Sequence, residues 1–186
     1  GRLAFDEIAS RLGERYVVAI VGVDQLKQYQ NQYGRPVAEQ VLRLVVPKIM
    51  AAAGTGKVYR LAGDELTLLF TARTATDTLA TFEKIRKTVE QISLRLRNQT
   101  RVWEGSRAPG SGIKDLDLPL SVSIGVAEAT PPGPLLTVVT KTAYRALYEA
   151  KGEGGNIVRR ATMQAAPVKS ASQPTGRIVA YSAFDR

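Results

Sequence analysis

The sequence predicts an α/β fold, more closely an α+β sandwich in which helices flank a central sheet. Residues 16–23 form a β-branched run that is typical of a buried strand. Residues 57–61 and 66–70 are two further apolar runs, and the Ala62-Gly63-Asp64-Glu65 between them has the composition of a tight hairpin turn. Residues 76–98 repeat apolar side chains at helical spacing. Strands and helices therefore alternate along the chain.

The other segments extend this alternation in both directions. Gly and Pro in Tyr33-Gly34-Arg35-Pro36 predict a break inside an otherwise helical stretch. The remaining expected elements, in chain order, are a helix at 3–14, a broken helix at 24–53, a polar Gly-rich surface loop at 100–117, a strand at 118–127, a helix at 134–152 and a short closing strand at 155–160.

The composition is that of one globular domain followed by a tail. The chain has 186 residues, of which 44% are hydrophobic and 23% charged, so a single domain over residues 1–160 is expected. Residues 161–175 are rich in Ala, Ser, Gln and Pro without an apolar period. We expect a flexible basic linker or tail over 161–186, in which 176–184 are either an added edge strand or the start of a further domain.

The absence of two residue types excludes several kinds of site. The chain contains no cysteine and no histidine, so disulfides, thiolate metal sites and imidazole chemistry are excluded. Catalysis would depend on carboxylates, Lys, Arg, Ser, Thr or Tyr. No apolar run approaches the roughly 20 residues that span a bilayer, and the first residues lack a secretory pattern, so a cytoplasmic location is expected.

The formal charge of +9 raises the question of a nucleic-acid partner. Five Lys or Arg face one Asp after residue 156, and the remaining excess is spread along the chain. A solvated surface and a basic tail explain this distribution, so nucleic-acid binding is the least favoured hypothesis. The expected helix at 76–98 has a basic outer face, whose members are Lys84, Arg86, Lys87, Arg95 and Arg97.

Four segments carry motifs in a fixed order. They are Gly22-Val23-Asp24-Gln25-Leu26-Lys27 with Gly34 and Glu39 after it, Arg60-Leu61-Ala62-Gly63-Asp64-Glu65-Leu66, Leu120-Ser121-Val122-Ser123-Ile124-Gly125-Val126-Ala127, and Ala143-Tyr144-Arg145-Ala146-Leu147-Tyr148-Glu149-Ala150-Lys151 with Gly154-Gly155-Asn156 after it. Each is weak alone. In this order and spacing, over residues 2–160, they resemble the GGDEF family of diguanylate cyclases.

The resemblance implies a central antiparallel sheet flanked by helices, similar to the palm of nucleotide cyclases and polymerases. It also implies two GTP molecules, one on each subunit of an antiparallel pair, and magnesium held by carboxylates. The implied catalytic residues are Asp64, Glu65 and Lys27. Carried over by position, the substrate-binding residues are Gln30, Glu39 and Lys151, and the metal ligands are Asp64 and, more weakly, Asp24.

Three departures from the family pattern predict that the domain is catalytically inactive. Gly22 occupies the position of the family's first metal-binding Asp, and Gly155 occupies the position of the family's phosphate-binding Arg. Gln30 and Glu39 replace the guanine-reading Asn and Asp with side chains one methylene longer. Metal, base and phosphate contacts are thus all weakened. For Asp24, we expect capping of the following helix in preference to a metal role.

The favoured hypothesis is a regulatory, dimerising or partner-binding module in cyclic di-GMP signalling, beside other signalling domains of the same protein. Two alternatives stay open: an active cyclase with a rearranged metal site at Asp24, Asp64 and Glu65, and a domain that senses GTP without turnover. Magnesium is expected only with bound nucleotide. The family's inhibitory cyclic di-GMP motif falls on Ala53 and Gly56, so no such site is expected.

Overall fold

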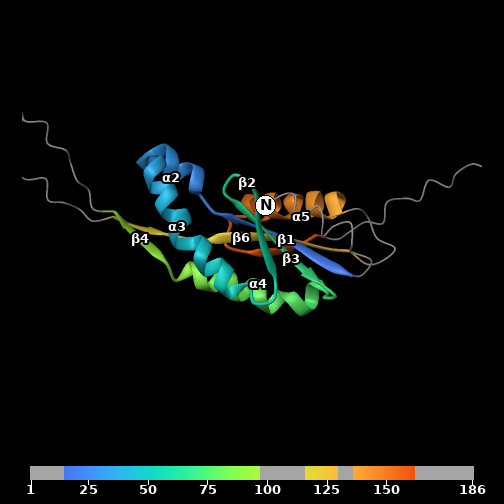
Figure 1. The fold of residues 1–186 in the computed structure, drawn as a ribbon. Coiled ribbons are helices and arrows are strands. Elements are labelled where there is room, and N and C mark those ends of the chain that lie inside the picture. The colour runs from blue at the N-terminus through green and yellow to red at the C-terminus, as the bar shows by residue number, and fades with distance from the viewer. Residues whose placement is uncertain (1–14, 97–115, 130–135, 162–186) are drawn as a thin grey trace, which may run out of the picture.

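The computed structural model describes residues 15–96, 116–129 and 136–161. Their main sheet has five strands in the order β2-β3-β1-β6-β7, and every neighbouring pair is antiparallel except β6 and β7 (Figure 1). A two-stranded ribbon, β4–β5, lies apart from it. The elements are β1 (Tyr16–Val23), α2 (Leu26–Tyr33), α3 (Arg35–Ala52), β2 (Lys57–Ala62), β3 (Glu65–Thr71), α4 (Ala75–Glu90), β4 (Ser93–Leu96), β5 (Leu116–Pro119), β6 (Val122–Ala129), α5 (Leu136–Gly152) and β7 (Val158–Arg160). The predicted sandwich around a central, mostly antiparallel sheet is confirmed.

The central strand β1 separates two hydrophobic cores. All of its residues are buried, and successive side chains of a strand point to opposite faces. Val17, Ala19 and Val21 pack into the larger core beneath α3 and α4, while Val18 and Ile20 face the smaller core beneath α5. The helices therefore cover both faces, with α5 on one side of the sheet and α4 on the other in Figure 1.

Local sequence signals set the helix boundaries. The predicted break falls at Gly34, whose φ of +88° is favourable for glycine, and Pro36 lies in the first turn of α3. Thr74 begins α4 with a capping box: the Asp77 backbone N–H donates to the Thr74 hydroxyl and the Thr74 N–H donates to the Asp77 carboxylate. These caps satisfy backbone donors that a helix start leaves free.

Helix α5 lies unusually close to the sheet. A Cβ on Gly125 of β6 would stand 2.2 Å from both the Ala143 carbonyl oxygen and the Leu147 backbone nitrogen. Only glycine permits this approach. As a result, the C-terminal turn of α5 reaches the end of β1, where Gly22 lies.

The predicted helix at 76–98 is wrong beyond Glu90. Residues 93–96 instead form β4, which pairs antiparallel with β5, so residues 116–117 also leave the predicted loop. Leu94 and Leu96 pack against the larger core and alternate with exposed residues, which is the period of a strand. Arg95 consequently lies on β4, paired with Asp117, and not on a basic helix face.

Other boundaries differ by smaller amounts. The strand expected at 118–127 is two strands, because β5 ends at Pro119 and β6 begins at Val122. The closing strand is limited to 158–160, since Gly155 and Asn156 both have positive φ and form a turn. The helix expected at 3–14, most of the loop at 100–117, Arg97 and the tail from 162 lie outside the described residues.

Candidate functional site

The hairpin between β2 and β3 carries the acidic residues Asp64 and Glu65 at one end of these strands. Gly63 has a φ of +59°, which allows the tight turn, and Arg60 Nε donates across the turn to the Gly63 carbonyl at 2.8 Å. Asp64 is exposed at the tip, whereas Leu66 is buried in the larger core. The apolar anchor therefore fixes the strand while Asp64 faces solvent.

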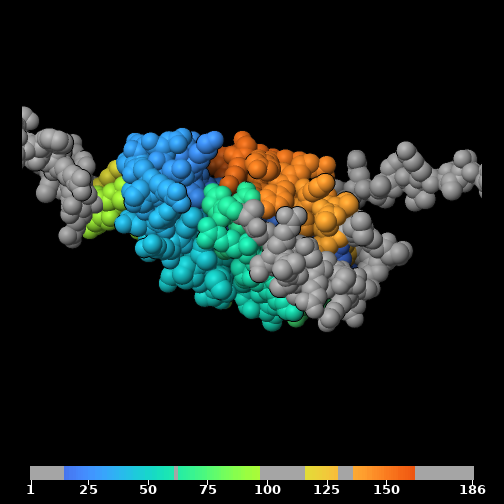
Figure 2. Space-filling view, turned by 45° about the horizontal axis from the view of Figure 1, so that its top comes forward, coloured from blue at the N-terminus to red at the C-terminus, as the bar shows by residue number. Residues whose placement is uncertain are grey.

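Four of the residues predicted from the sequence line a single pocket of about 570 Å³. Lys27 and Gln30 come from α2, Glu39 comes from α3, and Asp64 comes from the hairpin. In Figure 2 the green hairpin lies between the blue α2–α3 pair and the orange α5. Lys151, Glu65 and Asp24 do not line this pocket.

The pocket has more cationic than anionic groups. Lys27, Arg35 and Arg60 face two acids, Glu39 and Asp64. Arg35 Nε lies 3.0 Å from Glu39 Oε1, one helical turn away, so the carboxylate that would read a base edge is already paired. Both partners are exposed, and such a pair is weak enough for a ligand to displace. The charge balance favours an anionic ligand.

Lys151 reaches the site from the last turn of α5 and lies directly over Gly22. Its Nζ is 2.7 Å, and its Cε 2.9 Å, from the position that a Cβ on residue 22 would take. Gly22 pairs with Glu65 across β1 and β3, so the ammonium group lies next to the start of β3. The ammonium therefore occupies the space that a side chain at residue 22 would need.

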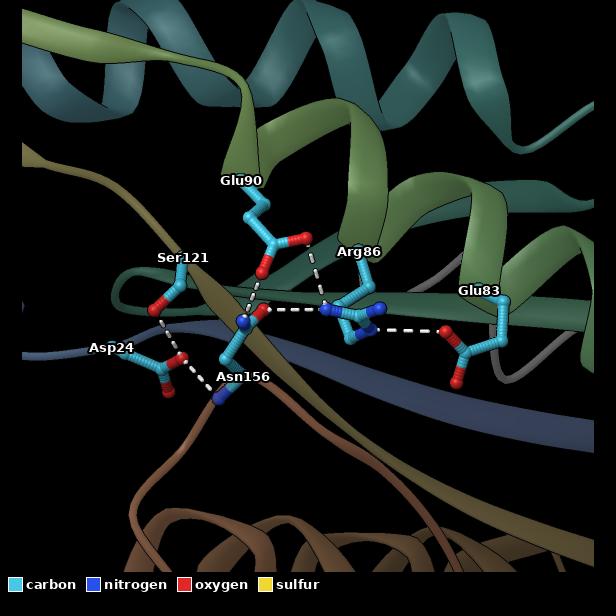
Figure 3. Close-up of polar contacts among 6 residues, drawn as sticks. All are labelled: Asp24, Glu83, Arg86, Glu90, Ser121 and Asn156. Carbon is cyan, nitrogen blue, oxygen red and sulfur yellow. Dashed lines mark hydrogen bonds and ion pairs between the residues drawn. The ribbon is translucent and has the colours of Figure 1, made fainter.

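Asp24 is a buried structural carboxylate. It accepts hydrogen bonds from the Ser121 and Ser123 hydroxyls, each at 2.7 Å, and from the Asn156 backbone N–H at 2.8 Å. These donors come from the residue just before β6, from β6 itself and from the turn before β7, as Figure 3 shows for Ser121 and Asn156. The expected helix cap is wrong: Gln25 is the N-cap of α2, and no side chain caps it.

Asn156 extends this contact to helix α4 (Figure 3). Its side-chain oxygen accepts from Arg86 at 3.0 Å and its side-chain nitrogen donates to Glu90 at 2.6 Å. Arg86 also pairs with Glu83 at 2.9 Å and with Glu90 at 3.2 Å. Arg86 is 15% exposed, so it is part of a connected polar cluster and not of a solvated basic face.

Tyr144 of α5 lies close to Glu65 and Asp64 of the hairpin, a contact that the sequence did not indicate. Burial raises the pKa of the Tyr144 hydroxyl, and the charge of Glu65 together with a hydrogen bond to it raises the pKa further. The charges of Tyr148 and Asp64 contribute in the same direction. Glu65 thus has a phenol partner on α5.

A divalent cation does not fit these side chains. Within the described ranges, no three acidic residues form a group that could hold a metal ion. Asp24, Asp64 and Glu65 do not lie together as such a group in the described residues. Both Asp24 oxygens accept protein hydrogen bonds, Glu65 interacts with Tyr144, and Lys151 places a positive charge over Gly22.

Some site residues had a sequence signal and others did not. Ser121 and Ser123 are two residues apart where the chain enters β6, a spacing that in extended backbone places both hydroxyls on one face. Arg60 is the first residue of the motif segment at 60–66, and Arg35 precedes Glu39 by one helical turn. No local signal links Lys151 to Gly22 or Tyr144 to Glu65, because these contacts depend on the packing of α5.

The described helices include none that is long and apolar enough to cross a membrane. At the positions of the inhibitory motif, Ala53 is 1% exposed, and a Cβ on Gly56 would stand 2.4 Å from the Phe70 ring.

Comparisons of the sequence with protein families and with known proteins all match the same family. The family model described as "Diguanylate cyclase, GGDEF domain" matches residues 4–157. Diguanylate cyclase DosC of Escherichia coli K12 is 30% identical over 151 residues, which are 81% of this chain and 29% of DosC. The bifunctional diguanylate cyclase/cyclic di-GMP phosphodiesterase MucR of Pseudomonas aeruginosa is 28% identical over 80% of this chain and 19% of its own length. This chain thus spans less than a third of either relative.

Among solved structures, the GGDEF domain of DgcB from Caulobacter crescentus, crystallised with c-di-GMP, is similar with a TM-score of 0.69. It is 27% identical, and the match covers 86% of this chain and 89% of that one. The active GGEEF domain of a diguanylate cyclase from Vibrio cholerae has a TM-score of 0.64 at 16% identity, over 87% of this chain and 92% of that one, so it supports the fold alone.

Proposed function

The chain belongs to the GGDEF family of diguanylate cyclase domains, and we propose that it is a catalytically silent member that acts as a regulatory or partner-binding module in cyclic di-GMP signalling. The observation that carries this proposal is the Lys151 ammonium over Gly22. A family member that condenses two GTP molecules uses a carboxylate there to hold magnesium. In this chain the same place carries a positive charge.

Electrostatics explain why the change matters. Phosphoryl transfer depends on cations that neutralise the charge developing on the phosphate oxygens. Magnesium requires several oxygen ligands at short range, and here Asp64 is left without a second free carboxylate. An active cyclase with a rearranged metal site would need Asp24 to give up three hydrogen bonds in the interior. That exchange is unfavourable because it would leave buried donors unsatisfied.

A second function, nucleotide sensing without turnover, is favoured by the pocket. Lys27, Gln30, Glu39 and Asp64 still converge on one cavity large enough for a nucleotide base and ribose. Glu39 retains an acceptor and Gln30 retains both a donor and an acceptor. A bound GTP would couple α2–α3 to the hairpin, which is the kind of change that a regulatory domain can transmit.

The relatives suggest the setting in which such a module operates. DosC and MucR are several times longer than the matched region, and MucR is named as both a cyclase and a phosphodiesterase. We propose that this domain likewise works beside other signalling domains of its protein, in the cytoplasm, and that it pairs with a second copy as its family implies.

The test is a cyclase assay under conditions that favour pairing. The chain, alone and fused to a dimeric leucine zipper ahead of residue 15, is incubated with GTP and magnesium, and products are separated by chromatography. The zipper removes failure to dimerise as an explanation for inactivity. We expect no cyclic di-GMP. Asp64→Ala is the matched control: product made by the wild-type chain and lost in this variant would overturn the proposal.

A further inference from the structure

Two ammonium groups near the hairpin have no anionic partner. Among residues 15–96, 116–129 and 136–161, neither Lys27 nor Lys151 forms an ion pair. Lys27 lines the pocket beside Asp64, and Lys151 lies over Gly22 at the neighbouring end of β1. The cationic groups at this end of the sheet are therefore available to a ligand.

The acidic groups nearby are mostly engaged. Glu39 pairs with Arg35, Asp24 accepts three hydrogen bonds, and Glu65 interacts with Tyr144. Of these four acids, Asp64 alone has neither an ion pair nor a hydrogen bond in the part of the chain that the structure describes. The local balance is thus suited to an anion and unsuited to a divalent cation.

We infer that this site holds the phosphate groups of a nucleotide without magnesium, so that Lys151 and Lys27, the lysines that the family resemblance assigns to phosphate, supply the positive charge by themselves. The inference rests on the proposed function and names the ligand chemistry of that site. The Lys151 ammonium takes the role that a metal ion has elsewhere: it supplies the positive charge. Gly22 is what permits this, because a Cβ there would stand 2.7 Å from Nζ.

Lysine is chemically suited to this substitution. Its ammonium group is a compact point charge with three donors on a flexible stem, so it can follow a phosphate as the nucleotide settles. It provides charge without the octahedral geometry by which magnesium activates an attacking hydroxyl. Binding without turnover follows from the same substitution.

The first test compares nucleotide binding with and without metal. Titration calorimetry of the whole chain with GTP is carried out once with excess magnesium and once with EDTA. We expect the two dissociation constants to agree within about twofold, because no protein group holds the metal. A roughly tenfold or greater loss of affinity in EDTA would overturn the inference.

The second test restores a carboxylate at residue 22. Gly22→Asp places an acid beside Glu65, displaces the far end of the flexible Lys151 side chain and requires a small shift of the Leu147 side chain, whose Cδ2 would stand 3.3 Å from the new Cβ. We expect Mn²⁺, detected by electron paramagnetic resonance in the absence of nucleotide, to bind this variant and not the wild type. Gly152→Asp is the matched control, since its Cβ has no neighbour within 4 Å. Mn²⁺ bound at this site by the wild type, and lost in Asp64→Ala, would contradict the inference.

The third test removes the ammonium. Lys151→Met should weaken GTP binding in EDTA by roughly tenfold, the effect of losing one charge-assisted contact. Lys141→Met, an exposed lysine on the same helix, should leave binding unchanged. Equal affinities for both variants and the wild type would exclude a role for Lys151. This variant creates no steric conflict, so it remains informative if Gly22→Asp fails to fold.

Products are analysed in the same samples, so the two proposals fail separately. Cyclic di-GMP in the calorimeter cell overturns the silent function. Absence of binding in both buffers, or binding that requires magnesium without product, overturns only the metal-free site.

Discussion

Asp24 provides the sharpest prediction about the fold, because its carboxylate joins three segments far apart in the sequence. Asp24→Ala removes the acceptor for Ser121, Ser123 and Asn156. Ser123 is fully buried, so its hydroxyl would lose its partner without access to water. Ser121 and Asn156 are half-buried, so water can replace part of what they lose.

These contributions set the size of the effect. An unsatisfied buried donor costs about 1–3 kcal/mol, and Ser123 belongs at the upper end of that range. With smaller costs at the other two donors, we expect Asp24→Ala to lower the free energy of unfolding by about 3–5 kcal/mol. For a domain of this size, that corresponds to a fall in Tm of roughly 10 °C.

Asp24→Asn separates the structural role from a metal role. The amide is nearly isosteric, its oxygen can still accept from Ser121 and Asn156, and its nitrogen can donate to a reoriented Ser123 hydroxyl. We therefore expect a loss of only about 1 kcal/mol. A metal ligand would behave differently, because the wild type alone would gain stability from magnesium and both variants would lose that gain.

The assay is urea unfolding followed by circular dichroism, repeated with magnesium and with EDTA. Asp117→Ala is the control, since the exposed pair of Asp117 with Arg95 should contribute under about 1 kcal/mol. If Asp24→Ala cost no more than this control, or if the wild type were stabilised by magnesium through Asp24, the reasoning would be refuted.

Two further predictions concern the fold. Gly125→Ala should lower the free energy of unfolding by at least about 3 kcal/mol, because the added methyl would stand 2.2 Å from backbone atoms of α5. Gly152→Ala, which has open space around it, should change the free energy of unfolding by under about 1 kcal/mol. Similar values for the two variants would contradict the close approach of α5. The Thr74 backbone and hydroxyl hydrogen bonds lower the pKa of Asp77, so its contribution to stability is present above the unfolded pKa and lost as the pH falls through the folded one. Asp77→Asn should therefore be less stable than the wild type at neutral pH, and the gap should close in acid; a gap that stayed constant in urea titrations across this pH range would exclude the capping role.

The sequence predicted those parts of the fold that depend on neighbours in the chain. The β-branched run of β1, the hairpin around Gly63 and the break at Gly34 are all local, and each lies where it was expected. The end of α4 was missed because the apolar spacing of a helix continues past Glu90. The competing alternation of Leu94 and Leu96 becomes decisive only once β5 is present to pair with β4.

In the candidate site, too, the sequence identified residues that belong to local motifs but not the contacts that depend on tertiary packing. The resemblance identified Lys27, Gln30, Glu39 and Asp64, and the structure brings them to one pocket. It could not identify the partners of Asp24, which lie 97 to 132 residues away along the chain. Nor could it show that Lys151 fills the space over Gly22, since that contact depends on the close packing of α5 on Gly125.

The two glycines at altered positions are both explained by the side chains next to them, but in different ways. At Gly22 the nearest neighbour is the flexible end of Lys151, which can move aside, and the Leu147 side chain lies 3.3 Å from the Cβ position. At Gly155 the φ of +78° disfavours any side chain, and a Cβ would stand 2.9 Å from the Asp24 carboxyl carbon, which is fixed by three hydrogen bonds. An arginine at residue 155 would thus disrupt the Asp24 contacts, whereas an acid at residue 22 would displace the Lys151 ammonium group and shift the Leu147 side chain slightly. Glycine at residue 155 is therefore required by the fold, whereas glycine at residue 22 is constrained only by the Lys151 and Leu147 side chains next to it.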